Sequence, residues 1–157
     1  MARRRQAIKR PPQIDARYNS PVVARLITAV MRSGGKNVAR RIVYRALDVL
    51  AEKNPGVNTL DILQRSLENA KPRIETKARR VGGATYQVPL EIPGDRQTAL
   101  AMRWLVTFAD NRKGIPMQEA LAAELMDAYQ GQGAAIRKRD DVHKMAQANK
   151  AFAHFRW

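Results

Sequence analysis

The sequence predicts a mainly α-helical single domain of about six helices, with a protruding two-stranded β-hairpin between the third and fourth helices. Three observations support this fold class. Apolar residues recur at helical spacing over most of the chain. That spacing is interrupted at 73–92, where β-branched and aromatic residues flank a diglycine. The length of 157 residues suits one domain whose core needs no disulfide.

The first half of the chain is expected to form three helices. Ser20 followed by Pro21 is typical of a helix start, because serine caps free N–H groups and proline suits the first turn. Gly34 and Gly35 are expected to end that helix, and Asn54-Pro55-Gly56 the next one. The predicted helices are 21–32, 36–53 and a third that starts after Asn58 or Thr59 and ends near Ala70.

Residues 73–92 are expected to form a two-stranded ribbon. Both glycines of Gly82-Gly83 tolerate a positive φ, as the two-residue turns of hairpins require. A two-residue loop would set the cross-strand pairs Arg79 with Tyr86 and Lys77 with Val88. Pro89 lacks an N–H group, so the second strand is limited to the edge of a sheet.

Three more helices are expected in the second half, at 95–110, after Ile115-Pro116, and at 134–152. The last one has a sparse apolar stripe, so it should dock loosely or on a partner. The chain therefore divides into a flexible basic arm at 1–19 and a helical domain at 20–157.

The charge balance limits the classes of function. The chain has 29 lysines and arginines against 14 acids, a net charge of +15 and a pI near 11.1. A small domain needs a net charge of only roughly 2–8 for solubility. The excess favours a polyanionic partner over a generally basic surface. The chain has no cysteine, which excludes disulfides, thiolate metal sites and cysteine nucleophiles and suits a reducing compartment.

The cations gather in four places: the arm, the turn into the second helix, the ribbon, and a turn near residue 112. The arm cannot bury enough apolar surface to fold alone, so it should become ordered on a polyanion. Arginine dominates the arm and ribbon, and its planar fork can bind two phosphate oxygens or stack on a base. The clustered cations are Arg3, Arg4, Arg5, Lys9, Arg10 and Arg17, then Lys36, Arg40, Arg41 and Arg45, then Lys71, Arg73, Lys77, Arg79 and Arg80, and finally Arg112 and Lys113.

RNA is favoured over DNA as the polyanion. The sequence contains no basic zipper and no cysteine–histidine finger, and an arm with a ribbon suits an irregular folded RNA better than a regular groove. A helix-turn-helix formed by the first two helices remains an alternative.

No catalytic site, metal site or cofactor is predicted. Ser33-Gly34-Gly35-Lys36 lacks the spacing of a phosphate loop. His143 and His154 have no nucleophile and carboxylate at suggestive spacing, and Asp140 and Asp141 should pair locally with neighbouring cations. With no secretory signal and no apolar run near the roughly 18 residues of a membrane span, a cytoplasmic protein without a membrane partner is expected.

The aromatic residues fall into two groups. Trp104 and Phe108, with Met102, lie in an apolar helical segment and are expected in the core. Tyr86, in the exposed ribbon, and Trp157, at the end of the chain, are the better candidates for stacking on bases.

Several segments resemble one known family. Residues 80–89 (RVGGATYQVP) are similar to the hairpin of the bacterial form of the seventh protein of the small ribosomal subunit. Residues 143–157 (HKMAQANKAFAHFRW) are similar to the bacterial tail of that family. The opening Met-Ala-Arg-Arg-Arg and the Gly-Gly-Lys turn fit as well. The resemblance spans essentially the whole chain, with no evident insertion.

The resemblance implies a protein that binds the 3′ major domain of small-subunit ribosomal RNA and nucleates assembly of the head. It also implies a monomer within the ribosome, beside neighbouring small-subunit proteins and near the exit-site tRNA and the mRNA. Together with the basic clusters, it gives these expected contacts with ribosomal RNA: Arg3, Arg4, Arg5, Lys9, Arg10, Gly35, Lys36, Arg40, Arg41, Arg73, Lys77, Arg79, Arg80, Arg112 and Lys113. The residues expected near tRNA or mRNA are Gly82, Gly83, Tyr86, Lys144, Lys150 and Arg156. A free-standing RNA-binding regulator of translation remains an alternative.

Overall fold

The structure, a computed structural model, describes residues 13–155 and confirms the predicted fold class. Its elements are α1 (Pro21–Val30), α2 (Lys36–Lys53), α3 (Thr59–Ala70), β1 (Ile74–Val81), β2 (Ala84–Glu91), α4 (Gly94–Asp110), α5 (Met117–Tyr129), α6 (Ala134–Ala148) and the 3-10 helix η1 (Lys150–Phe155). The predicted contact residues outside the described range are Arg3, Arg4, Arg5, Lys9, Arg10, Arg156 and Trp157.

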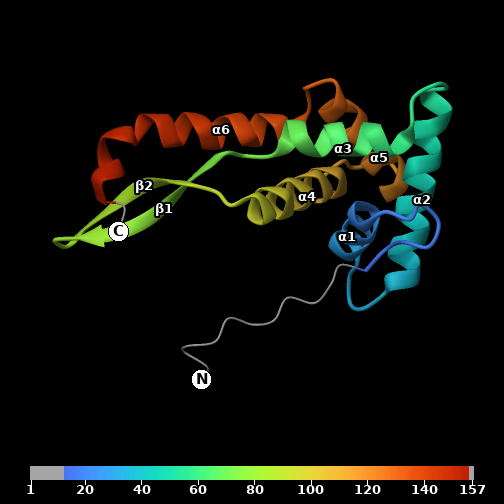
Figure 1. Cartoon of the computed structure of the whole chain (residues 1–157), viewed down its shortest axis with the longest axis horizontal. Coiled ribbons are helices and arrows are strands. Elements are labelled where there is room, and N and C mark those ends of the chain that lie inside the picture. The colour runs from blue at the N-terminus through green and yellow to red at the C-terminus, as the bar shows by residue number, and fades with distance from the viewer. Residues whose placement is uncertain (1–12, 156–157) are drawn as a thin grey trace.

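The described chain is elongated (Figure 1). Helices α1 to α5 pack into a body at one end, and the ribbon formed by β1 and β2 projects away from it. Helix α6 runs from the body out along the ribbon, and η1 turns back onto β2. The C-terminal segment therefore covers part of the ribbon. No helix within residues 13–155 combines the length and apolar character needed to cross a membrane.

Helix α5 lies at the centre of the core. It packs against α2, α3 and α4, and its buried side chains occupy more than one face, as expected for a helix enclosed by others. Leu121 and Leu125 are fully buried. The buried hydroxyl of Ser66 on α3 lies 2.6 Å from the carbonyl oxygen of Ile62 and 2.8 Å from that of Leu125. The contact between α3 and α5 therefore includes a satisfied polar group.

The boundaries of α2, α3 and α4 follow the sequence closely, whereas α1 ends earlier than predicted. Helices α2 and α3 lie where predicted, and the side chain of Asn58 caps α3. Ser20 occupies the N-cap position of α1 without a side-chain hydrogen bond. This helix, predicted to reach residue 32, ends at Val30. Met31 is already extended (ψ 131°) and Ser33 has a φ of +49°, so the turn begins before the diglycine.

The ribbon has the predicted register. Both expected pairs, Arg79 with Tyr86 and Lys77 with Val88, are present. Gly82 and Gly83 have φ values of +57° and +90°, as a two-residue type I′ turn requires. Among the described residues the sheet has two strands, so Pro89 lies in a strand that keeps one free edge.

The last predicted helix, 134–152, is divided in two. Helix α6 ends at Ala148, and η1 continues the chain as a 3-10 helix. Ala135 and Ile136 in the first turn are buried, whereas Met145 of the predicted stripe is 48% exposed. The start of α6 is thus fixed in the core, and loose docking of the remainder stays a prediction.

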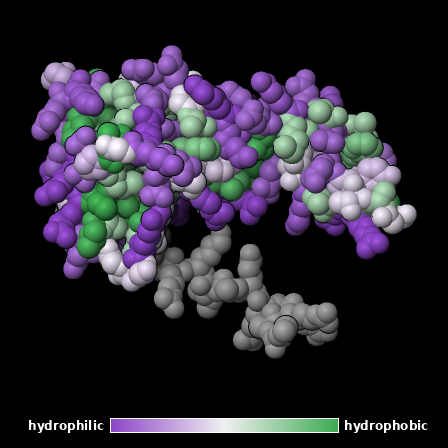
Figure 2. Space-filling model, turned by 180° about the vertical axis from the view of Figure 1, so that it is seen from behind, coloured by the Kyte–Doolittle hydropathy of each residue, from purple (hydrophilic) through white to green (hydrophobic). Residues whose placement is uncertain are grey.

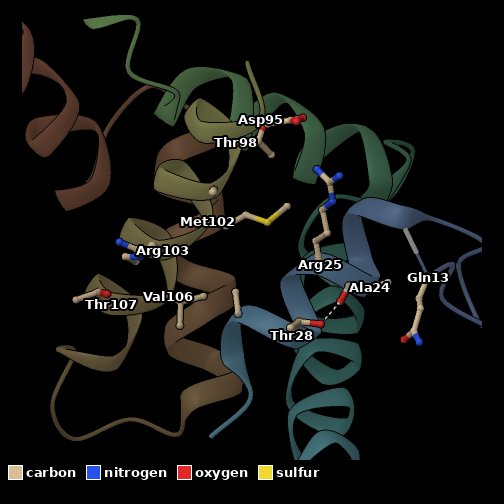
Figure 3. Close-up of a pocket in the computed structure, with 12 residues that line it drawn as sticks. Gln13, Ala24, Arg25, Thr28, Asp95, Thr98, Met102, Arg103, Val106 and Thr107 are labelled. Atoms are coloured by element: carbon tan, nitrogen blue, oxygen red, sulfur yellow. Dashed lines mark hydrogen bonds between the residues drawn. The ribbon is translucent and has the colours of Figure 1, made fainter. Parts of the chain in front are cut away.

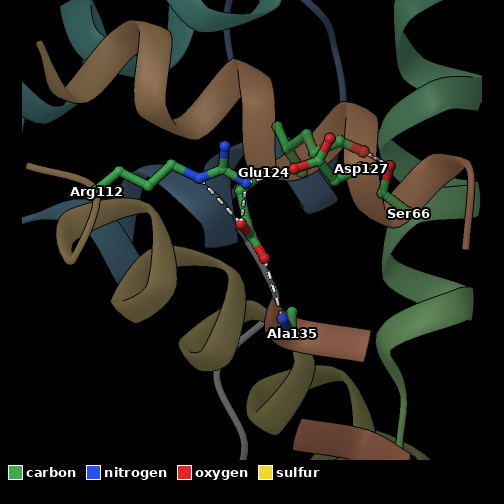
Figure 4. A network of polar contacts seen from close by, with 6 residues as sticks. Ser66, Arg112, Glu124, Asp127 and Ala135 are labelled. Atoms are coloured by element: carbon green, nitrogen blue, oxygen red, sulfur yellow. Dashed lines mark hydrogen bonds and ion pairs between the residues drawn. The ribbon is translucent and has the colours of Figure 1, made fainter. Parts of the chain in front are cut away.

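A buried carboxylate holds the start of α6 (Figure 4). The Glu124 side chain on α5 is 1% exposed, and its Oε1 accepts a hydrogen bond from the backbone N–H of Ala135 at 3.0 Å. Its Oε2 accepts from Nη2 (2.5 Å) and Nε (3.2 Å) of Arg112. The Nη2 of Arg112 also lies 2.5 Å from Oδ2 of Asp127. Hydrogen bonds with Asp127 and then Glu124 raise the pKa of Arg112. The charge of Glu124 is tolerated because both oxygens have donors.

Gly133 lets the chain enter α6 beside this carboxylate. Its φ is +97°, a region that favours glycine. A Cβ at this position would lie 3.0 Å from Cβ of Asp127 and 3.3 Å from Oε1 of Glu124. Glycine and the buried carboxylate together determine where α6 starts.

Replacing Glu124 with alanine should destabilise the fold. The change leaves Arg112 with Asp127 alone and removes the acceptor for the Ala135 N–H. Because breaking a buried ion pair costs about 3 kcal/mol, the free energy of unfolding measured in urea should fall by about that amount. Glu119→Ala, at an exposed position of the same helix, is the control and should change it by less than about 0.5 kcal/mol. Equal losses in the two variants would contradict the role of the network.

Candidate nucleic-acid interface

A groove of about 740 Å³ runs between α1 and α4 (Figure 3). Arg25 on α1 and Arg103 on α4 stand on its two sides, and both are exposed. Met102 contributes apolar lining between them, and Asp95 lies at one end. Arginine forks on both sides of an apolar surface suit a nucleotide, because the forks bind phosphate while a base or sugar packs on the apolar part.

Sequence reasoning did not single out Arg25 or Arg103. Each is a separate cation on an amphipathic helix, so neither belongs to a charge run. Each arginine lies opposite the apolar stripe of its helix, and this position predicts that its side chain is exposed. It does not show which helices lie side by side, so the groove could not be predicted. The structure adds this groove to the four basic clusters predicted from the sequence.

The groove connects to the turn before α2. Gln13, the first described residue, lines the groove, and its Oε1 accepts a hydrogen bond from Nζ of Lys36 at 2.9 Å. Gly35 is the N-cap residue of α2. Lys36 and Arg41 are exposed, and Arg40 is half-buried. The structure therefore brings together the groove, the beginning of the described chain and the predicted cluster on α2.

The ribbon presents a second basic surface. Its exposed predicted cations are Arg73, Lys77 and Arg80. Arg79 is half-buried, and its Nε has no hydrogen-bond partner among the described residues. Glu75 joins the ribbon to the body, because its two carboxylate oxygens accept from Nε (2.8 Å) and Nη2 (3.0 Å) of Arg96 on α4. The ribbon is thus held at its base and cationic along its length.

Aromatic rings join the ribbon to the C-terminal segment. The ring centroid of Tyr86 lies 5.1 Å from that of Phe152 and 5.2 Å from that of Phe155. Tyr86 is consequently half-buried, because η1 folds back onto β2, and the stacking of its ring on a base stays a prediction. The other described members of the set expected near tRNA or mRNA are all exposed: Gly82, Gly83, Lys144 and Lys150.

Arg112 has partners within the protein. Its side chain is 31% exposed and its guanidinium is held by Glu124 and Asp127. A phosphate would compete with two carboxylates for this group. The neighbouring Lys113 is exposed. Contacts of Arg112 and Lys113 with RNA stay predictions, and the geometry favours Lys113.

Two further expectations are confirmed. Met102 is buried, and Trp104 and Phe108 pack against the core. The local pairing expected for Asp140 is present, with Oδ1 2.6 Å from Nη2 of Arg139, while that of Asp141 stays a prediction. Across residues 13–155, no group of three or more histidine, aspartate and glutamate side chains is placed to hold a metal ion.

His143 joins α6 to the start of the ribbon. Its Nε2 lies 3.0 Å from the backbone nitrogen of Arg73 and accepts a hydrogen bond from it, which requires an unprotonated Nε2. Burial lowers the pKa of His143, and the positive charge of Arg139 lowers it further. The neutral imidazole is therefore the form that supports this contact.

The face opposite to that of Figure 1 is mainly hydrophilic from the body to the ribbon (Figure 2). Apolar patches interrupt it, most extensively towards the end formed by α1 and α2 and also near the ribbon. Both the helical body and the ribbon therefore offer polar surface, as contact with an extended polyanion requires.

A helical body with an arginine-lined groove and a cationic ribbon defines a class of structural proteins that bind a polyanion over an extended surface. The family model for ribosomal protein S7p/S5e matches residues 2–150, and the chain belongs to this family. The chain is 55% identical to small ribosomal subunit protein uS7 of Akkermansia muciniphila, 53% to that of Nocardioides sp. and 49% to that of Protochlamydia amoebophila. Each match covers 100% of both chains. The resemblance seen in the hairpin and the tail is confirmed.

Acid should loosen the base of the ribbon. The folded-state pKa of His143 is lowered, so between that value and the unfolded value near 6.5 the unfolded chain binds more protons. The stabilisation is complete above about pH 6.5 and is lost as the pH falls towards the folded-state pKa. The protection of the Arg73 amide against hydrogen exchange, relative to its intrinsic rate, should therefore fall between about pH 7.5 and pH 5.

The control for this effect is His143→Gln, which does not titrate in that range. Its Arg73 amide should show the same protection at both pH values. A wild-type protein whose Arg73 protection is also independent of pH would rule out the role of His143.

Proposed function

We propose that the chain is a structural constituent of the small ribosomal subunit, without catalytic activity, that binds the 3′ major domain of its ribosomal RNA and nucleates assembly of the head. Membership of the S7p/S5e family and full-length similarity to small ribosomal subunit proteins support this proposal. The geometric observation that carries it is one groove lined by Arg25 and Arg103, to which Lys36 is connected through its hydrogen bond with Gln13.

Binding is dominated by the phosphate backbone. Exposed arginines in the groove and on the ribbon offer paired donors to phosphate oxygens, and each contact releases condensed counterions. If some eight to ten phosphates are contacted, the logarithm of the binding constant should fall with the logarithm of salt concentration at a slope of roughly −6 to −9. The arm residues Arg3, Arg4, Arg5, Lys9 and Arg10 belong to the proposed footprint.

The ribbon tip and the C-terminal segment are proposed to lie near the exit-site tRNA and the mRNA. The tip glycines Gly82 and Gly83 and the α6 residue Lys144 are exposed. The 3-10 helix η1 packs on β2 and so connects the C-terminal segment to the ribbon. In this arrangement the protein acts as a monomer within the cytoplasmic ribosome, beside neighbouring small-subunit proteins.

Binding to separate RNA domains tests the proposal. The purified chain should bind a transcript of the 3′ major domain more tightly than a transcript of another small-subunit RNA domain of equal length, at the same salt concentration. Equal affinity for both transcripts would mean that the chain binds RNA only as a general polyanion, without preference for the 3′ major domain. A chain that binds one short messenger RNA and fails to co-sediment with the small subunit would instead be a free-standing regulator.

Charge reversal on the ribbon should weaken RNA binding. Lys77→Glu should lower the affinity about tenfold, because a charge-assisted contact contributes about 1.5 kcal/mol or more. The control is Lys53→Glu on α2, also at an exposed position and with the same change in net charge. Filter binding at fixed salt compares the two variants. An equal loss for Lys53→Glu would mean that total charge, not the ribbon, determines affinity.

Charge reversal in the groove should have a similar effect without unfolding the protein. Arg103→Glu removes a groove cation, so the affinity should drop about tenfold and the salt slope should flatten by about one. Arg65→Glu, on an exposed position of α3, is the matched control. Thermal midpoints of both variants should stay close to that of the wild type, because both positions are exposed. Unchanged affinity of Arg103→Glu would exclude the groove from the footprint.

A further inference from the structure

The segment before α1 is held on α2 by one carboxylate. Asp15 is 6% exposed. Its Oδ2 accepts hydrogen bonds from the backbone N–H groups of Arg17 (3.0 Å) and Tyr18 (3.1 Å), which closes a turn. Its Oδ1 accepts from the hydroxyl of Tyr44 on α2, at 2.8 Å. One side chain thus both shapes the segment and attaches it to a helix.

A second contact reinforces this attachment. The guanidinium of Arg17 binds both carboxylate oxygens of Asp48 on α2, at 3.1 and 2.7 Å. It also lies 5.3 Å from the ring centre of Tyr18 and 5.2 Å from that of Tyr44. The two rings meet edge to face, with centroids 5.8 Å apart. Residues 13–19, expected within the flexible arm, are therefore packed on α2.

Asp15 stays ionised in this position. Burial alone would favour its neutral form, but hydrogen bonds from Tyr18, Tyr44 and Arg17, together with the nearby positive charge of Arg40, outweigh that effect. The pKa of Asp15 consequently lies below its ordinary value. A carboxylate beside a phosphate-binding surface would repel RNA, and its burial keeps it away from such a partner.

The attachment determines where the basic arm begins. Gln13, two residues before Asp15, lines the groove and accepts a hydrogen bond from Lys36. In the sequence, Arg10 and Lys9 come immediately before the Pro11-Pro12 pair that leads into Gln13. A fixed starting point limits the volume that a tethered segment can search, which raises its effective concentration at a neighbouring site.

We propose that Asp15 is a positioning residue for RNA binding, whose carboxylate fixes the start of the basic arm at the mouth of the groove so that the arm engages RNA already bound there. This inference rests on the proposed function, because it requires that the arm and the groove contact the same RNA. Asp15 itself touches no RNA in this arrangement.

A double-mutant cycle in the full-length chain tests the inference. Asp15→Asn is combined with an arm in which Arg3, Arg4, Arg5, Lys9 and Arg10 are each replaced by glutamine. In the wild-type background, Asp15→Asn should lower the affinity for the 3′ major-domain transcript about fivefold, because preorganisation is lost. In the neutral-arm background the same substitution should change affinity less than about twofold.

The sign of the effect separates positioning from charge. Asp15→Asn removes a negative charge from a chain whose net charge is +15, so electrostatics alone would raise the affinity for RNA. Tyr44→Phe removes the bond to Oδ1 while leaving the charge, and should reproduce the loss. The salt slope should flatten in both variants, because the arm makes fewer phosphate contacts.

Each outcome bears on a separate claim. Equal losses in both arm backgrounds, or a gain in affinity from Asp15→Asn, would overturn the positioning role. A loss on neutralising the arm, with none from Asp15→Asn or Tyr44→Phe, would overturn it and leave the proposed function intact. Neutralising the arm could leave the affinity for RNA unchanged while the groove and ribbon variants lose affinity. The arm would then not contact the RNA, and the inference about Asp15 would be wrong while the proposed function stands.

Discussion

The placement of the C-terminal part of the molecule depends on the buried carboxylate of Glu124. This side chain receives the guanidinium of Arg112 from the turn after α4 and the backbone N–H of Ala135 at the start of α6. Three segments therefore meet at one charge, which is stable because both oxygens have donors. Helix α6 carries His143 to the base of the ribbon and leads into η1, whose rings cover Tyr86. The interior of the body thus determines how the distant ribbon is covered.

Elements with a local chemical cause could be predicted from the sequence. Gly82-Gly83 sets the register of the ribbon, because a two-residue turn with positive φ leaves one pairing of the strands. The stripe of α2 and the break at Asn54-Pro55-Gly56 define that helix. The end of α1 was predicted two residues late, because Met31 is already extended (ψ 131°), and nothing in the local sequence indicates this conformation.

The site was less predictable, because it depends on packing. Glu119 and Glu124 are both acids of α5, yet one is exposed and the other is enclosed by Arg112 and α6. Arg25 and Arg103 line the same groove only because α1 lies beside α4 in the folded chain. The runs of charge found in the sequence include the exposed ribbon cations, but they also include Arg112, which the protein neutralises internally. A run of charge in the sequence shows where cations lie, but it does not show whether each cation pairs inside the protein or stays free for RNA.

The positions of the acids explain which cations remain for a partner. Asp48 holds Arg17, Glu75 holds Arg96 and Asp127 holds Arg112, each where two elements join. By contrast, Lys77, Arg80 and Arg103 form no ion pair with any residue between 13 and 155.

Pairing those exposed cations internally would add little stability, because surface ion pairs contribute about 0–1 kcal/mol. It would also remove the phosphate contacts proposed for these side chains, each of which would strengthen the binding of a polyanion. The basic surface therefore follows from carboxylates that are used at the junctions between elements, such as Asp48, Glu75 and Asp127, while cations outnumber acids in the groove and on the ribbon. The same placement lets the fold tolerate a net charge of +15, since its junctions are neutralised while the remaining excess lies on exposed surface that RNA neutralises in turn.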